Sequence, residues 1–257
     1  MTDRRRERRD TLVRAGAAGV LREDPGLARH LPPAEAQTAT RLAVARVVSL
    51  PKGIFWPHER FPSEKGTLGM LLLDGMLLRG VAVTDRPTVE VLGPGDVFRP
   101  FELDPDPDAM VSGEVGWWAL RPARVAVLDA SFTRRMSGHP GVIAELAGRL
   151  SRRSAASSLR LALVGEPHLS VRLQRVLWQL AGRFGEAQAE GTLVRVPLCH
   201  MLLSWLVGAR RPAVSRAIGE LERAGRLARG PDGTWWLSQQ RPEGLGEPMP
   251  PAQILAA

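Results

Sequence analysis

The feature that most constrains the fold of this chain is a change in the period of its apolar residues near residue 138. From Val47 to about Asp129, short apolar runs alternate with turn-forming Gly, Pro and Asp, which is typical of a small antiparallel barrel or sandwich. After Gly138 the apolar residues recur at helical spacing instead. The sequence therefore predicts an α+β protein with a β-rich N-terminal part and a helical C-terminal part.

The β-rich part is expected to contain many short strands separated by turns. Examples are Leu68–Leu73, Met76–Val83, Val89–Leu92 and Val125–Leu128, and Asp74-Gly75 is expected to form a turn between the first two. Residues 104–108 read Asp-Pro-Asp-Pro-Asp. Because proline cannot donate to a strand ladder, we expect this segment to be an exposed loop.

A long helix is expected over residues 139–165, where apolar or small residues recur in steps of four and three. These heptad positions are Ile143, Ala147, Leu150, Ser154, Ser157, Leu161 and Val164. A seam of about three heptads allows two copies of a helix to pair, so we expect a homodimer formed through this helix. The alternative is an amphipathic helix that lies on the barrel of its own chain.

The last hundred residues carry the most specific motif. An amphipathic helix from Leu169 to Phe184 precedes two short helices, Leu198–Leu206 and Arg211–Ala224, which are joined by the turn Val207-Gly208-Ala209. Two short helices joined by a Gly-containing turn are typical of a helix-turn-helix. The hairpin expected from Arg226–Arg229 and Thr234–Leu237 would form a wing beside it.

The distribution of charge indicates a polyanionic partner. The net charge is +8, and residues 141–240 carry 14 Arg against 7 acidic residues. On the second short helix we expect Arg211, Ser215 and Arg216 to contact bases, because Arg offers two parallel donors to guanine. Phosphate contacts are expected from Arg210, Arg223, Arg226 and Arg229. The alternative is that these arginines only face solvent.

Residues Pro197 to Leu221 resemble the winged helix of the Crp/Fnr family of transcription regulators. Upstream, Leu73-Asp74-Gly75 and Val91–Phe98 resemble the family's sensor, a cupin-like antiparallel β-barrel of the cyclic-nucleotide-binding type. The resemblance covers about residues 27 to 238. It implies a homodimer that places two recognition helices in successive major grooves of double-stranded DNA. It also implies an effector sensed by the barrel and adds RNA polymerase as a candidate partner.

The sequence departs from the family at several positions. Pro212 replaces a frequent glutamate between Arg211 and Arg216, and Cys199 stands where a capping Thr is usual, although sulfur caps poorly. The Arg-Ser-Ala or Arg-Thr-Ala segment that holds a cyclic nucleotide's phosphate is missing, and Val111-Ser112-Gly113-Glu114 stands in its place. We therefore expect no binding of cyclic AMP or GMP in the usual mode, and the effector is unknown.

The expected organisation has five parts: a basic, disordered arm over residues 1–26, a sensor barrel over 27–138, the dimerisation helix over 139–165, a winged-helix domain over 166–240 and a flexible tail over 241–257. No segment approaches 18 uninterrupted apolar residues and no secretory signal begins the chain. A cytoplasmic protein without membrane contact is therefore expected.

Enzymatic and metal-binding functions are not expected. The five His are scattered and the chain has one Cys, whereas a metal-dependent cupin needs two or three clustered His with a carboxylate. We therefore expect no metal and no cofactor. A rival function is a protein-interaction module whose winged helix no longer reads DNA, motivated by the apolar Met201, Leu202 and Trp205.

Overall fold

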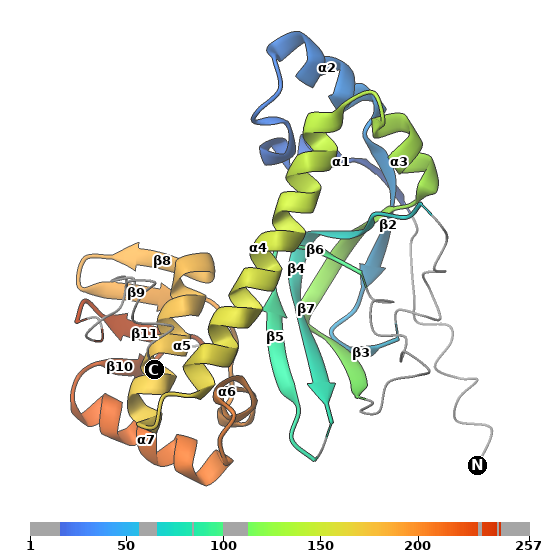
Figure 1. Ribbon diagram of the computed structural model, residues 1–257. Coiled ribbons are helices and arrows are strands. Elements are labelled where there is room, and N and C mark those ends of the chain that lie inside the picture. Colours follow the sequence, from blue (N-terminus) through green and yellow to red (C-terminus); the bar gives the residue numbers. More distant parts are fainter. Residues whose placement is uncertain are drawn as a thin grey trace, which may run out of the picture. The chain divides into compact units, whose positions relative to one another are not determined.

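The computed structural model describes residues 16–56, 66–83, 85–99, 113–230, 233–240 and 242. The chain divides into two compact units, Met1–Ser157 and Ser158–Ala257, and the boundary falls within the 25-residue helix α4 (Pro140–Val164). Each unit has its own sheet (Figure 1). The acidic loop 104–108, Val111-Ser112 and the expected tail, apart from one residue, lie outside the described residues.

The N-terminal unit is an antiparallel sheet with helices. Its seven strands have the order β1-β2-β7-β4-β5, with β3 paired to β7 and β6 paired to β4. This order is open, because no hydrogen-bonded pairing joins β1 to β5 among the described strands. The elements are β1 (Gly16–Gly19), α1 (Val20–Glu23), the 3-10 helix η2 (Pro25–Ala28), α2 (Pro33–Leu42), β2 (Val44–Leu50), β3 (Gly53–Phe55), β4 (Gly69–Ala82), β5 (Thr88–Leu92), β6 (Val97–Phe98), β7 (Glu114–Leu128), α3 (Ala130–Met136) and the first part of α4.

The strand β4 is irregular near its middle. It pairs with β7 on both sides of this point, but the register shifts between Leu72 and Leu77. Gly75 has a φ of 91°, and a Cβ there would lie 2.2 Å from the carbonyl oxygen of Pro122. The predicted turn at Asp74-Gly75 is therefore wrong: the glycine's positive φ and close approach accommodate an irregularity in one long strand instead of reversing the chain.

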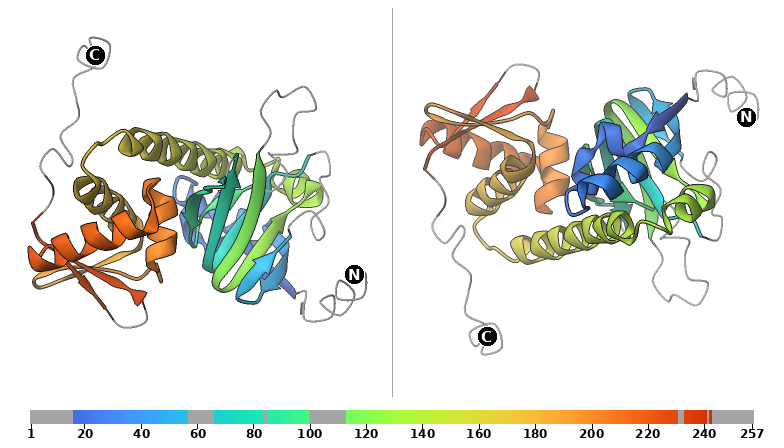
Figure 2. Two further views of the ribbon diagram at one scale, coloured as in Figure 1. Left: turned by 90° about the horizontal axis from the view of Figure 1, so that it is seen from below. Right: turned by 90° about the horizontal axis from the view of Figure 1, so that it is seen from above.

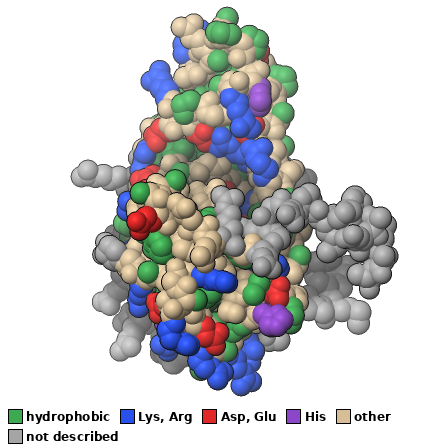
Figure 3. All heavy atoms as spheres, turned by 90° about the vertical axis from the view of Figure 1, so that its left-hand side faces the viewer, with side chains coloured by type: hydrophobic (Ala, Val, Ile, Leu, Met, Phe, Trp, Pro, Cys, Tyr) green, Lys and Arg blue, Asp and Glu red, His purple; other side chains and the backbone are tan. Residues whose placement is uncertain are grey.

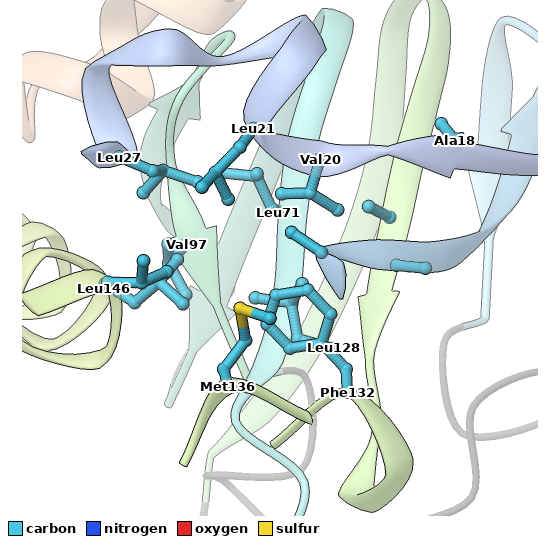
Figure 4. Close-up of a cluster of buried hydrophobic side chains, with 14 of the residues drawn as sticks. Ala18, Val20, Leu21, Leu27, Leu71, Val97, Leu128, Phe132, Met136 and Leu146 are labelled. Atoms are coloured by element: carbon cyan, nitrogen blue, oxygen red, sulfur yellow. The ribbon is translucent and has the colours of Figure 1, made fainter. Parts of the chain in front are cut away.

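Alternate residues of these strands face two different cores, as the two-residue period of a strand requires. One core combines Met70 and Leu72 from the first half of β4 with Leu77 from its second half and Trp117 from β7. The intervening Leu71 packs in the other core, against apolar side chains from α1, η2, α3 and α4 (Figure 4). The two halves of β4 therefore share a core on one face, while helices cover the other face of its first half.

The predicted disorder of residues 1–26 is wrong for its second part. The strand β1 pairs with β2 from Gly16 opposite Val47 to Gly19 opposite Val44. Val20 and Leu21 are buried in the helix-covered core. Burial of these apolar side chains orders the segment, which the high charge of the preceding residues obscured. Residues 1–15 lie outside the described residues.

A buried carboxylate fixes the start of α4 in the N-terminal unit. Glu145 accepts hydrogen bonds from Arg29 and Arg152, each at 2.7 Å, and from Arg149 at 3.3 Å. Burial raises the pKa of Glu145, but the hydrogen bonds from Arg152, Arg29 and Arg149 outweigh it and leave the pKa below its ordinary value. The ionised Glu145 therefore stabilises the folded N-terminal unit at neutral pH. This contribution is lost as the pH falls through the lowered pKa of Glu145.

The C-terminal unit packs three helices on a small sheet. Its four strands have the order β10-β11-β9-β8. The predicted amphipathic helix, the two short helices and the wing hairpin are confirmed, within two residues at their ends, whereas the β8–β9 hairpin was not predicted. Its elements are the end of α4, α5 (Leu169–Phe184), β8 (Gly185–Gln188), β9 (Gly191–Val194), α6 (His200–Val207), α7 (Arg211–Arg223), β10 (Leu227–Arg229) and β11 (Trp235–Ser238).

The helix α4 appears in both views of Figure 2 as a continuous helix. Its bounds agree closely with the predicted helix over residues 139–165. None of the helices in the described ranges has both the length and the apolar character needed to cross a membrane.

Candidate nucleic-acid interface

The turn between α6 and α7 is fixed by one glycine. Gly208 ends α6 with a φ of 64° and a ψ of 38°, a left-handed conformation that favours glycine. The next amide, that of Ala209, donates to the Ser204 carbonyl at 3.0 Å. Arg210 then adopts an extended conformation and α7 begins at Arg211. The chain therefore changes direction within three residues, as a helix-turn-helix requires.

The inner face of α7 is anchored in the core of the unit. Val214, Ala217, Ile218 and Leu221 are buried. Beneath the helices, the fully buried Trp235 of β11 donates from its indole Nε1 to the Leu198 carbonyl at 2.9 Å. Because one whole face of α7 packs against the core of the C-terminal unit, the opposite face points away from that core in a fixed direction.

A second anchor comes from α5, and no sequence pattern pointed to it. Arg172 donates from Nη1 to the Val207 carbonyl at 3.0 Å, and from Nε to the Glu166 carbonyl at 2.9 Å. The carbonyls in the last turn of a helix have no partner within that helix. Arg172 therefore satisfies the end of α6 next to the turn and ties α5 to the helix-turn-helix.

The outer face of α7 and its surroundings are rich in arginine. Arg211 and Arg216, the two predicted base contacts, are exposed. The four predicted phosphate contacts are exposed as well: Arg210, Arg223, Arg226 and Arg229. In Figure 3, Lys and Arg side chains gather at the lower edge of the molecule, at the height at which Figure 1 shows α7.

Ser215, the third predicted base contact, is less exposed than Arg211 and Arg216. Ser215 is only partly exposed, and its Oγ lies 2.9 Å from Nδ1 of His200 at the start of α6. The hydroxyl therefore already has one protein partner, although it can form a further hydrogen bond. His200 in turn lies 6.1 Å from the Trp235 ring, centroid to centroid. The sequence did not reveal this link, because the two residues are 15 positions apart.

Glu220 is a further polar residue of α7 that was not among the predicted contacts. This residue is exposed and follows Arg216 by four positions, so both lie on one side of α7. A carboxylate there can accept a hydrogen bond from cytosine N4 and repels phosphates. The four-residue spacing from Arg216 would have been enough to place Glu220 beside it from the sequence.

Two expectations for α6 have different outcomes. Cys199 is the N-cap residue and its side chain makes no capping hydrogen bond, as predicted for sulfur. Of the three apolar residues noted on this helix, Leu202 is buried, so for this residue packing within the chain holds rather than contact with a partner, while Trp205 is half-buried and Met201 is exposed. The helical period turns Leu202 inward with Leu203 and Leu206, so little of that surface is left for a protein partner.

The outward position of Gly219 allows a stability test that leaves the core untouched. A Cβ built at Gly219 meets no atom within 4 Å. Replacing Gly219 by alanine is therefore expected to raise the free energy of unfolding by about 0.5–1 kcal/mol, because alanine loses less backbone entropy in a helix. Thermal unfolding of the variant measures this gain. A loss of stability would show that the position is packed.

The inner core of the N-terminal unit is filled largely by apolar side chains. Trp117 lies 5.1 Å from Phe98 and 6.0 Å from Phe55 between ring centroids, and all three are buried in one core. Of the four residues 111–114, which stand in place of the phosphate-binding segment, Val111 and Ser112 lie outside the described residues and Glu114 begins β7. Within the described ranges, no group of three His, Cys, Asp or Glu could hold a metal ion.

Comparisons with known proteins agree with this geometry. Residues 171–245 match the family model of the Crp-like helix-turn-helix domain. No curated protein matches the chain. A solved structure of a CRP/FNR-family transcriptional regulator from Thermus thermophilus is 21% identical, covers 74% of this chain and 92% of its own, and has a TM-score of 0.52.

Two other solved structures extend the similarity. The c-di-GMP-responsive global regulator CLP of Xanthomonas campestris is 18% identical, covers 81% of this chain and 100% of its own, and has a TM-score of 0.55. A cyclic nucleotide-binding domain containing protein from Listeria monocytogenes is 13% identical, with coverages of 76% and 90% and a TM-score of 0.61. The C-terminal unit therefore contains a Crp-like helix-turn-helix domain, and the chain has the fold of CRP/FNR-family transcription regulators.

Proposed function

We propose that this chain is a homodimeric, sequence-specific DNA-binding transcription regulator. The observation that carries the proposal is the outer face of α7, where Arg211 and Arg216 are exposed while the inner face is locked into the core. Arg211 and Arg216 contact guanine edges in the major groove, and Ser215 assists from beside them. Arg210, Arg223, Arg226 and Arg229 contact phosphates and set the register.

The exposure of the predicted heptad seam on α4 supports a homodimer. Leu161 is 71% exposed in the single chain, and Ala147, Ser154 and Val164 are exposed as well. Ile143, Leu150 and Ser157 are partly exposed. Ile143 and Leu150 also pack against the core of their own chain, so it is the exposed positions Ala147, Ser154, Leu161 and Val164 that fit pairing with the same helix of a second copy.

In this proposal the N-terminal unit does not bind cyclic AMP in the usual mode. The sequence lacks the phosphate-binding segment, and the described inner core is filled by Phe55, Phe98 and Trp117. Close-packed aromatic side chains leave no room for a nucleotide in that core unless they move.

Replacing Arg216 by alanine tests the assignment of its role. The variant is expected to lose about 1–3 kcal/mol of discrimination between the preferred site and a site changed at one base pair, because a bidentate contact to guanine is lost. Sites are first selected from random duplex DNA with the unaltered chain. Gel-shift titrations of both proteins on the selected and the changed sites then give the loss.

Arg226→Ala is the matched control, since Arg226 is exposed and assigned to a phosphate. Its loss should weaken binding to all sequences about equally and reduce the slope of log affinity against log salt by about 1. Equal weakening by Arg216→Ala on all sequences would remove Arg216 from the base contacts. A chain that retains no duplex DNA in a salt-sensitive way would contradict the proposed function itself.

A further inference from the structure

A serine of α7 and the first residue of α6 form a linked pair beside the arginines of the candidate interface. The Ser215 Oγ lies 2.9 Å from His200 Nδ1. Within the described part of the chain, this is the only side-chain hydrogen bond that either residue makes. Both residues are partly exposed. The second ring nitrogen of His200, Nε2, and the remaining hydrogen-bonding capacity of the Ser215 hydroxyl are therefore left for DNA.

The imidazole of His200 is held in place by an anchored neighbour. Its ring lies 6.1 Å from the Trp235 ring, centroid to centroid, with the two planes inclined by 35°. Trp235 is itself fully buried and donates to the Leu198 carbonyl. Aromatic rings at this separation pack against each other. The imidazole therefore has an aromatic ring for support, and its contact with Ser215 has a defined geometry.

The link to an imidazole changes what the Ser215 hydroxyl can do. A serine hydroxyl without such a link rotates, so it can donate to one base or accept from another. If His200 Nδ1 accepts, the Ser215 hydrogen is used within the protein and the oxygen can only accept from DNA. If Nδ1 donates, the Ser215 hydrogen stays free and the hydroxyl can donate to DNA.

The second ring nitrogen of His200 decides between these two states. In a neutral imidazole one nitrogen carries the hydrogen, and the partner of one nitrogen sets the role of the other. The first helix of a helix-turn-helix crosses the DNA backbone, and α6 begins at His200 without a capping hydrogen bond from the Cys199 side chain. This end of α6 therefore suits a phosphate. Because phosphate oxygens only accept, Nε2 donates there and Nδ1 becomes the acceptor.

We propose that His200 is a positioning residue that makes Ser215 a hydrogen-bond acceptor in the major groove. Ser215 then selects a base with an amino group in that groove, which is adenine through N6 or cytosine through N4, and disfavours thymine O4 and guanine O6. The inference rests on the proposed DNA binding and adds the chemical class of the base that faces Ser215. In the major groove each base pair presents one amino group and one carbonyl, so this choice fixes the orientation of the pair.

The test begins with sites selected from random duplex DNA by the unaltered full chain. Gel-shift titrations then cover all single-base-pair changes of one selected half-site, with the unaltered chain and with Ser215→Ala. The base pair whose preference disappears in Ser215→Ala is the one that faces this residue. For the unaltered chain, reversing that pair should weaken binding at least about fivefold, because one hydrogen bond is lost and two acceptors are opposed.

Base analogues at this pair identify the group that Ser215 contacts. Purine in place of adenine, or 2-pyrimidinone in place of cytosine, removes the amino group. The carbonyl is removed by 2-aminopurine in place of guanine or by 5-methyl-2-pyrimidinone in place of thymine. Because each analogue also changes base pairing, its effect is compared between the two proteins. Loss of the amino group should weaken binding by the unaltered chain about three- to tenfold more than binding by Ser215→Ala, whereas loss of the carbonyl should affect both equally.

Variants of His200 separate positioning from a merely structural role. His200→Asp keeps an acceptor beside Ser215 and should retain the preference for the amino group, although its negative charge lowers affinity for all sequences. His200→Ala should lose the preference, because the Ser215 hydroxyl then rotates freely. Met201→Ala, which changes the exposed next residue of α6, should discriminate like the unaltered chain. Each preference compares two DNAs with one protein, so a less stable variant still gives a valid ratio.

The inference is overturned if loss of the carbonyl has the larger effect, if no base pair depends on Ser215, or if His200→Ala keeps the preference. Equal loss of preference in His200→Asp and His200→Ala also contradicts it. A chain that binds no duplex DNA in a salt-sensitive way overturns this inference together with the proposed function. DNA binding in which no base pair depends on Ser215 overturns the inference alone.

Discussion

Replacing Leu161 by glutamate is expected to separate the proposed homodimer and to abolish tight binding to DNA with two half-sites. Leu161 is 71% exposed in the single chain and occupies a heptad position, so pairing would bury it against a second copy. An unpaired carboxylate buried in this way costs about 3–5 kcal/mol. The dimer dissociation constant should rise by roughly two to four orders of magnitude. Sedimentation equilibrium and gel shifts measure both effects.

Leu159→Glu is the matched control for this variant. Leu159 is 52% exposed on the same helix, but it lies two residues from Leu161 and therefore on the opposite side of α4. This variant should remain dimeric and bind DNA normally. If Leu161→Glu also stays dimeric, or if both variants dissociate to the same extent, the heptad seam is not the dimer interface.

The second large effect is expected from Trp235→Ala. Trp235 is fully buried and its indole donates to the Leu198 carbonyl, so its removal leaves a cavity and an unsatisfied acceptor. Large-to-small changes of this kind cost about 3–5 kcal/mol. We expect the C-terminal unit to lose this amount and DNA binding to disappear at moderate temperature. Hydrogen exchange of the α7 amides reports the opening of this unit.

The neighbouring Trp236 provides the comparison, because it is only half-buried and points to the other face of β11. Trp236→Ala should cost about 1–2 kcal/mol. Trp235→Phe should fall between the two, because it keeps most of the buried area but loses the hydrogen bond. Equal losses for Trp235→Ala and Trp236→Ala would show that Trp235 does not hold α7 in place.

The helical half of this chain could be predicted because its signals are local. In α7, Val214, Ile218 and Leu221 repeat at helical spacing, and Gly208 marks the preceding turn. The β8–β9 hairpin has no such signal, since residues 185–188 contain no β-branched or aromatic residue. β9 also pairs with β11 across more than 40 residues of sequence, and pairing of this kind is set by tertiary structure.

In the candidate nucleic-acid interface, too, features set by local sequence could be predicted and features set by tertiary structure could not. The exposure of Arg211 and Arg216 could be predicted because it follows from the period of one helix. The contact between Ser215 and His200 could not be predicted, because the packing of α6 against α7 brings together residues 15 positions apart. The strand β4 was predicted as two strands because Asp74-Gly75 is typical of a turn, whereas its pairing with the distant β7 on both sides of Gly75 keeps it continuous.

The most direct test of DNA binding by a dimer changes the distance between the two half-sites in the DNA. Two recognition helices related by a two-fold axis should require half-site centres about one helical turn apart, roughly 34 Å. Sites selected from random duplex DNA should therefore be palindromic. Insertion of about 5 base pairs between the half-sites, half a turn, should reduce the affinity to that of unrelated DNA. Unchanged affinity after this insertion, or equal affinity for a single half-site, would contradict the dimeric arrangement.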